Sequence, residues 1–218
     1  MNLIIFKPLL ATAHFNYDGE EGPAYWADLD PENYASCNDK EGQSPINLPS
    51  NHINGVTNEL SIHWVTLKSP IAIIHNGHTV QVNVQDNAAG AQNYVTFRGV
   101  KYNFLQFHFH GGSEHHVDGH QTPLEMHAVH QAEAGQDLEH GELLVVAFML
   151  KENTDIKNFD NQFRKFENRV PVQKTAVPAL IRDTFQFDEM IEDARIYGFW
   201  EYVGSLTTPP CSGGVQVY

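Results

Sequence analysis

The sequence has few basic residues and no long apolar run. Lysine and arginine number 13 against 27 aspartates and glutamates, so the formal net charge of the 218 residues is −14. A chain this poor in positive charge is unsuited to phosphate contacts, and nucleic acid is not expected as a partner. No apolar stretch is long enough to cross a bilayer, so no membrane span is expected. The sequence also lacks an Asn-x-Ser/Thr sequon, an internal repeat and a low-complexity tract, which leaves a single ordinary domain as the simplest interpretation.

Only two cysteines occur, Cys37 and Cys211, and they lie far apart in the chain. The residues alone leave two free thiols and one disulfide equally open, although export would favour a bridge. The N-terminus bears on export, because a short apolar run ends in Ala-Thr-Ala, a small-residue pattern typical of signal cleavage sites. Residues 1–13 are therefore interpreted as a remnant of a secretory signal peptide, with a disordered extension as the alternative.

Alternation of apolar and polar residues dominates the chain after an entry rich in Gly, Pro, Asn and Asp. Such alternation is typical of half-buried strands. Strands are predicted within 72–84 about a turn at Asn76-Gly77, and over 94–99, 102–110, 124–133 and 141–151. Only residues 157–169 and 177–185 have helical spacing. The predicted fold class is mainly β (α+β), a single domain with a largely antiparallel sheet and a few short surface helices.

Histidines are concentrated in one segment, "QFHFHGGSEHHVDG" at residues 106–119. In a strand, residues i and i+2 point to the same side, so His108 and His110 share a face while the intervening phenylalanines take the other. The downstream strand "LEMHAVH" places His127 on one face by the same rule. If the two strands pair, three neutral imidazoles converge and leave one open position, which is the usual catalytic zinc site.

Two polar residues each precede a candidate ligand by two positions and share its face. Gln106 precedes His108, and Glu125 precedes His127. A zinc-bound histidine usually donates its other N–H to an amide, carboxylate or carbonyl, so both residues are expected to orient ligands rather than to be ordinary solvated side chains. Other histidines lack such an arrangement and are expected to be structural or exposed: His115, His116, His120, His130 and His140.

These segments resemble the α-class carbonic anhydrases. The matching stretches are "QFHFHGGSEHHVDG", "PLEMHAVHQ" and "GSLTTPPCSGG", with "YDGEEGPAYWADL", "GQSPINL" and "HNGH", and they span about residues 15–215 in the family's order. The resemblance implies a large twisted, mostly antiparallel central sheet and a Zn²⁺ cofactor. It also implies reversible hydration of carbon dioxide to bicarbonate and a proton through a zinc-bound hydroxide. Sulfonamide and anion inhibitors are expected, and a homodimer is left open.

The resemblance also implies roles for individual positions. The zinc ligands match His108, His110 and His127. Glu114 and Thr207 match a gate pair that orients the hydroxide. His78 matches a proton shuttle, and Tyr17 matches a tyrosine that orders water in the cavity. Substrate-contacting positions are matched by Thr207, Thr208, Leu206, Val129 and Val145.

The resemblance favours a disulfide and export, because Cys37 and Cys211 match a cysteine pair that is bridged in exported members. A secreted or periplasmic location is the resulting expectation. The chain departs from the family near its end, where Gly213 and Val217 stand at positions usually held by Glu and Trp. The family domain is thus expected over residues 14–218, without the usual C-terminal segment.

The alternative function is a catalytically impaired carbonic-anhydrase-like zinc-binding protein. Inactive relatives typically lose a ligand, whereas all three candidate ligands are present here together with Glu114 and Thr207. The sequence therefore favours the enzyme.

Overall fold

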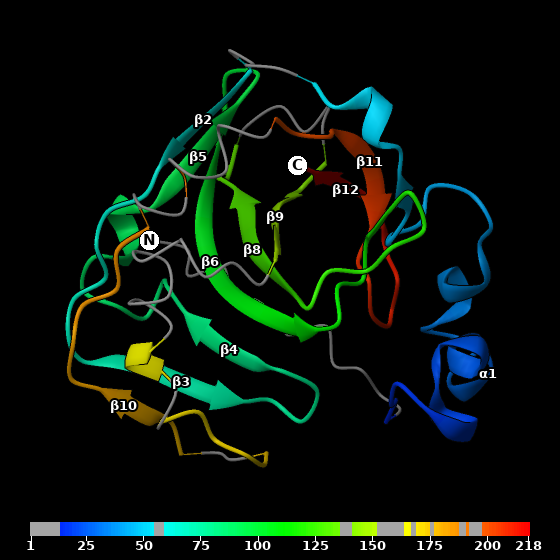
Figure 1. Cartoon of the computed structure of the whole chain (residues 1–218), viewed down its shortest axis with the longest axis horizontal. Helices are drawn as coiled ribbons and strands as arrows, with labels where there is room; N and C mark the ends of the chain where they lie inside the picture. The colour runs from blue at the N-terminus through cyan, green and yellow to red at the C-terminus, as the bar shows by residue number, and fades with distance from the viewer. Residues whose placement is uncertain are drawn as a thin grey trace.

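The structure, a computed structural model, is built around one large curved sheet with short helical turns at its side. It describes residues 14–54, 59–135, 141–151, 164–166, 169–174, 177–187, 191 and 198–218. The main strand order is β10-β3-β4-β6-β8-β9-β12-β11, and β2 joins through β5, which pairs with β6. Figure 1 shows β6 as one long bent strand within this sheet. The strands are β2 (Leu60–His63), β3 (Ile71–His75), β4 (Val80–Asn83), β5 (Tyr94–Phe97), β6 (Val100–Gly111), β8 (Leu124–Ala132), β9 (Leu143–Leu150), β10 (Ala179–Ile181), β11 (Tyr202–Ser205) and β12 (Gly213–Val217).

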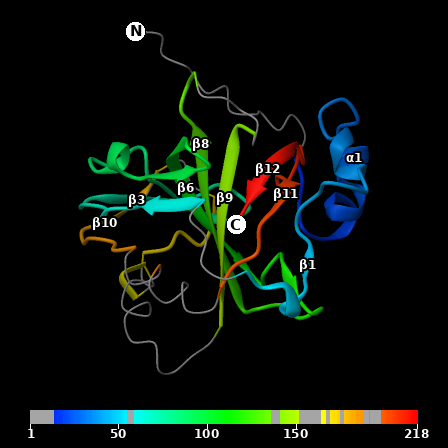
Figure 2. The ribbon, with the colours of Figure 1, turned by 90° about the horizontal axis from the view of Figure 1, so that it is seen from above.

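The sheet is mostly antiparallel, as predicted. Within it, β12 runs parallel to β9, while β6 is antiparallel to both β4 and β8. A separate parallel pair joins β1 (Asn47–Leu48) to β7 (His116–Val117). The helix α1 (Trp26–Leu29) lies beyond β11, on the side of the molecule away from β3 and β10 (Figures 1 and 2). Short 3-10 turns occupy Gly19–Glu21, Pro23–Tyr25, Ala35–Asn38, Ser50–His52 and Gly90–Gln92.

The mainly β prediction is confirmed, but the helix predicted over residues 177–185 is wrong. Apolar residues at 177, 180, 181 and 185 fit a helical period, yet β10 pairs antiparallel with β3. This pairing leaves Leu180 half exposed and buries Ile181, which is the two-residue period of an edge strand. Of the other predicted helix, 157–169, the structure describes 164–166, which are helical, and 169. No helix of the described part of the chain is long and apolar enough to cross a membrane.

A β-bulge in β6 decides which side chains reach the core. The β6–β8 register shifts between Phe104 and Gln106. Before the shift, residues 100, 102 and 104 are buried in the core; after it, Phe107 is buried there instead. Because a bulge adds one residue to one strand, it exchanges the faces of all residues that follow. His108 therefore turns away from the core although it has the same parity as Phe104.

A buried histidine sits inside the aromatic core. Trp64 Nε1–H donates to His130 Nε2 at 3.1 Å, and His130 Nδ1 lies 3.3 Å from the Leu144 carbonyl oxygen. The ring of Phe104 stacks on the imidazole at a centroid distance of 4.5 Å. Burial lowers the pKa of His130 to about 3, although the carbonyl opposes this by favouring the charged form. One nitrogen thus donates and the other accepts, which only the neutral ring can do.

We expect His130 to make the fold sensitive to acid. Below about pH 6.5 the unfolded chain binds a proton at this position that the folded chain excludes, so stability falls as pH falls. One such group contributes a slope of about 1.4 kcal/mol per pH unit between its two pKa values. His130→Gln, which keeps a donor and an acceptor without titrating, should lower stability at pH 8 but flatten the slope between pH 6 and 4. Urea unfolding across this range measures the slope, and exposed His120→Gln is the control. An unchanged slope in His130→Gln would contradict the expectation.

Candidate metal centre

The β6–β8 register brings three histidines together. His108 and His127 are directly opposite Cα partners across these antiparallel strands. Their ring centroids lie 5.3 Å apart, and the ring of His110 lies 5.0 Å from His108 and 4.7 Å from His127. One nitrogen from each ring lies within 4.8 Å of the other two. The three imidazoles thus converge on one point, as predicted.

Hydrogen bonds to two of the rings decide which nitrogen atoms face that point. His108 Nδ1 lies 2.9 Å from Gln106 Oε1, and His127 Nε2 lies 2.7 Å from Glu125 Oε1. Amide and ionised carboxylate oxygens only accept, so these two ring nitrogens carry the protons. His108 Nε2 and His127 Nδ1 remain as acceptors. His110 Nε2 is buried and has no hydrogen-bond partner among the described residues.

The residues present fit a zinc ion. Burial is the largest cause that lowers the pKa of His108, well below its ordinary value, and that of His110, to about 3. Burial also disfavours the charged form of His127, but its hydrogen bond to Glu125 outweighs this and raises its pKa. Neutral imidazoles are the form that binds metal, and three histidines with an open fourth position match a catalytic zinc site. A cation at this point would also provide the partner that buried His110 Nε2 lacks.

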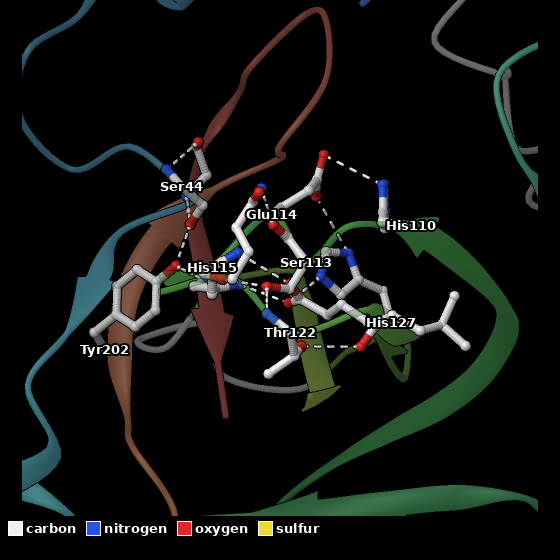
Figure 3. A network of polar contacts seen from close by, with 12 residues as sticks. Ser44, His110, Ser113, Glu114, His115, Thr122, His127 and Tyr202 are labelled. Atoms are coloured by element: carbon white, nitrogen blue, oxygen red, sulfur yellow. Dashed lines mark hydrogen bonds and ion pairs between the residues drawn. The ribbon is translucent and has the colours of Figure 1, made fainter. Parts of the chain in front are cut away.

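A chain of hydrogen bonds beside His127 includes His115, Tyr202 and Ser44 (Figure 3). Glu125 joins this chain to His127. The Glu125 carboxylate accepts from His127 and, at 2.6 Å, from His115 Nδ1. On its other side, His115 Nε2 lies 2.6 Å from the Tyr202 hydroxyl oxygen, within hydrogen-bond distance. The Tyr202 oxygen in turn lies 2.7 Å from Ser44 Oγ. These bonds outweigh the burial of Glu125, which alone would raise its pKa, and hold that pKa well below its ordinary value.

His115 belongs to the site, and the sequence did not predict this. It was expected to be structural or exposed by default, and it is buried against Glu125. Nothing in its spacing signals this contact, because His115 lies in the loop after β6. By contrast, His120 is exposed and His130 lies in the core. His140 and the interpreted signal remnant, residues 1–13, lie outside the described residues.

Glu114 lies beside two of the imidazoles. Its Oε1 is 3.3 Å from His110 Nδ1 and its Oε2 is 3.9 Å from His127 Nδ1. Burial raises the pKa of Glu114, while the nearby His127 imidazole and a hydrogen bond from Thr207 oppose this. The structure thus places the two predicted gate residues together at the edge of the trio.

A cavity of about 250 Å³ lies over the three histidines. One part of its wall is apolar, where Val129, Val145 and Leu206 pack with Val217. Every predicted substrate-contacting position lines this cavity, and so do both Tyr17 and His78. Val217 is a lining residue that was not predicted to contact substrate. The polar part of the cavity wall includes Asn76, Gln81 and Gln106.

His78 is held at the cavity wall by an aromatic ring. Phe15 stacks on it at a centroid distance of 3.9 Å and an interplanar angle of 6°. Burial lowers the pKa of His78. Neighbouring basic groups lower it further: His14, Lys174 and His75. The ring is thus biased toward its neutral form at neutral pH.

A disulfide joins Cys37 to Cys211, with the two Cα atoms 5.0 Å apart. The bridge expected from the resemblance is therefore present. Gln43 Nε2 donates to the Cys211 carbonyl oxygen at 3.2 Å, which ties the same segment to the entry loop. Both links anchor the chain four residues beyond Thr207.

A sequence model of eukaryotic-type carbonic anhydrases matches residues 21–217. The chain belongs to the eukaryotic-type carbonic anhydrase family. The carbonic anhydrase of Klebsiella pneumoniae is 31% identical over 203 residues, covering 93% of this chain and 74% of that protein. The carbonic anhydrase of a Nostoc species is 33% identical over 215 residues, covering 94% and 71%.

Solved structures agree with the family assignment. The α-carbonic anhydrase of Thermovibrio ammonificans, in complex with sulfanilamide, superposes with a TM-score of 0.76 at 30% identity. The match covers 94% of this chain and 82% of that one. The Photobacterium profundum α-carbonic anhydrase gives a TM-score of 0.73 at 28% identity. The protein is accordingly an enzyme, a carbonic anhydrase by family.

We expect the carbonic anhydrase to bind one zinc ion per chain through the trio. Replacing His108 by Ala should weaken zinc binding more than about 100-fold, because losing a ligand costs more than the 10–100-fold typical of losing its orienting partner. His120→Ala, an exposed histidine in the neighbouring loop, is the matched control. Zinc content after dialysis against a chelator series measures the affinity. Equal affinity in His108→Ala and His120→Ala would show that the ion is held elsewhere.

Proposed function

We propose that this carbonic anhydrase hydrates carbon dioxide reversibly to bicarbonate and a proton, with Zn²⁺ held by His108, His110 and His127. The observation that carries the proposal is the convergence of three imidazoles, one with a buried nitrogen that has no hydrogen-bond partner among the described residues, below a half-apolar cavity. Zinc bound to three such ligands supplies Lewis acidity that lowers the pKa of a water molecule to about 7, so that a hydroxide nucleophile is available at neutral pH.

The apolar wall suits carbon dioxide. Val129, Val145 and Leu206 present methyl groups to the cavity beside the trio. Carbon dioxide carries no hydrogen-bond donor and no net charge, so a dry wall can hold it without a polar partner. Excluding water from this side also leaves the nucleophile free of competing hydrogen bonds.

Thr207 and Glu114 orient the attack. An ionised Glu114 accepts a hydrogen bond from the Thr207 hydroxyl. The Thr207 oxygen is therefore left to accept a hydrogen bond from the attacking oxygen. This arrangement aims a lone pair of the nucleophile at the carbon atom, and such orientation can contribute several kcal/mol to catalysis. The buried position of Glu114 strengthens the contact, because charge-assisted hydrogen bonds are stronger at low dielectric.

His78 moves the proton. Each hydration cycle leaves one proton in the cavity, and an imidazole that titrates near neutrality can carry it to solvent. His78 lines the cavity and remains partly exposed. Its lowered pKa favours release of the proton to solvent in the hydration direction. Tyr17 lines the same cavity, and burial together with the charge of Glu114 raises the pKa of its hydroxyl, so it orders water as a neutral donor and acceptor.

Export and inhibition complete the proposal. The Cys37–Cys211 disulfide supports a secreted or periplasmic location, because such bridges persist in oxidising compartments. The sulfanilamide complex of the Thermovibrio relative supports inhibition of this enzyme by sulfonamides. A catalytically impaired zinc-binding protein is less well supported, since Glu114 and Thr207 lie together beside the trio.

Stopped-flow measurement of carbon dioxide hydration tests the proposed reaction. The zinc-loaded protein should accelerate hydration, sulfanilamide should abolish the acceleration, and His108→Ala should reduce it to the background rate because the trio is broken. Glu114→Gln should lower kcat/KM while zinc stays bound, since an amide accepts the Thr207 proton less well than a carboxylate. Stoichiometric zinc without hydration would favour the impaired zinc-binding protein instead.

Buffer dependence tests His78. In dilute buffer, His78→Ala should lower kcat by about tenfold or more and leave kcat/KM unchanged, because only proton export depends on it. Added imidazole should restore kcat by carrying the proton in place of the ring. His120→Ala, which removes an exposed histidine that does not line the cavity, is the control. If kcat in dilute buffer survives the loss of His78, another group exports the proton.

A further inference from the structure

The turn that carries His78 is rigid in its own right. It connects β3 to β4, and Asn76 Oδ1 accepts the main-chain N–H groups of both His78 and Thr79 at 2.9 Å. The Asn76 N–H in turn donates to the Thr79 carbonyl oxygen at 3.1 Å. Such an Asx turn fixes the shape of the segment but does not fix its position relative to the metal centre.

Thr79 links this turn to the strand that carries two of the zinc ligands. The β4–β6 register ends at the pair Gln81 and His108. One step further along β6, the Phe109 N–H donates to Thr79 Oγ1 at 3.3 Å, and the Thr79 hydroxyl donates to the Phe109 carbonyl oxygen. A side chain thus takes the place of the next main-chain partner in the ladder. Both polar groups of Phe109, which lies between His108 and His110, are bound by one hydroxyl.

We propose that Thr79 is a positioning residue for proton transfer, whose hydroxyl holds the His78 turn at a fixed distance from the zinc ligands of β6. The proposal rests on the hydration reaction and the His78 shuttle proposed above. Phe15 stacks on the His78 ring, and Thr79 anchors the adjacent backbone. Together, Phe15 and Thr79 restrict both the imidazole ring of His78 and the backbone that carries it. Proton transfer through ordered water requires such restriction, because small displacements from the productive geometry cost large factors in rate.

The side chain of Thr79 has the chemistry that this link requires. A hydroxyl donates once and accepts once here, so it satisfies an N–H and a C=O at the same time. Valine has nearly the same shape and can do neither, so it would leave two main-chain groups of β6 without this partner. Serine keeps the hydroxyl and loses only a methyl group. The pair Thr79→Val and Thr79→Ser therefore separates the hydrogen bonds from the packing.

The test compares carbon dioxide hydration by the zinc-loaded protein and its Thr79 variants in dilute and concentrated imidazole buffer. Thr79→Val should lower kcat in dilute buffer by roughly three- to tenfold, with kcat/KM and zinc content unchanged, and imidazole should restore kcat. Thr79→Ser should behave like the unmodified enzyme. Thr96→Val, which removes a strand hydroxyl from β5, is the matched control.

Each outcome bears on the proposal. A kcat in dilute buffer that Thr79→Val leaves unchanged would overturn it. A parallel loss of kcat/KM and zinc content would also overturn it, because Thr79 would then support the ligand strand rather than the shuttle. An unmodified enzyme without hydration activity would instead refute the proposed function. Adding His78→Ala to Thr79→Val gives a further check, since two changes that act on one proton path should not multiply.

Discussion

The pairing of β6 with β8 is the constraint on which the rest of the site depends. His108 and His127 meet because they are direct partners in one antiparallel register, and His110 joins them because it follows two residues later on the same face. A shift of one residue in either strand would turn its ligands toward the aromatic core and its core residues, such as Phe107 of β6 or Met126 of β8, toward the cavity. The metal centre and the hydrophobic core therefore specify the same register, each from one face of the sheet.

The orienting groups follow from the same register. Gln106 and Glu125 lie on the faces of their ligands, two residues before His108 and His127, and each accepts from the nitrogen that the metal does not need. Glu125 is also hydrogen-bonded to His115, in the loop after β6, and His115 is hydrogen-bonded to Tyr202 of β11. Strands that are distant in the sequence are thereby tied to the geometry of one imidazole. An orienting shell of this kind preserves ligand geometry more strictly than three isolated side chains could.

Much of this architecture could be predicted from the sequence, because period-two alternation specifies strand faces without any tertiary information. That rule predicts the face that His108 and His110 share and places Gln106 and Glu125 on the faces of their ligands, and the trio follows from it if the two strands pair. The rule fails where tertiary contacts decide: residues 177–185 have a helical period but form an edge strand because β3 offers main-chain partners. The rule also predicts nothing about loop residues such as His115, whose partner Glu125 lies ten positions away on β8. The Cys37–Cys211 bridge could be predicted only from the family resemblance, because the cysteine spacing did not distinguish one disulfide from two free thiols.

The histidines show why residue type alone could not complete the assignment. His130 and His127 lie three positions apart on β8, so they point to opposite faces, and the faces differ in what they offer a ring. On the core face, Trp64 and the Leu144 carbonyl oxygen engage both nitrogens of His130 and leave no lone pair for a metal. On the cavity face, Glu125 engages one nitrogen of His127 and leaves the other free to bind. A ligand is thus distinguished from a structural histidine by the number of its nitrogens that the fold has already satisfied, and the register of the sheet sets that number.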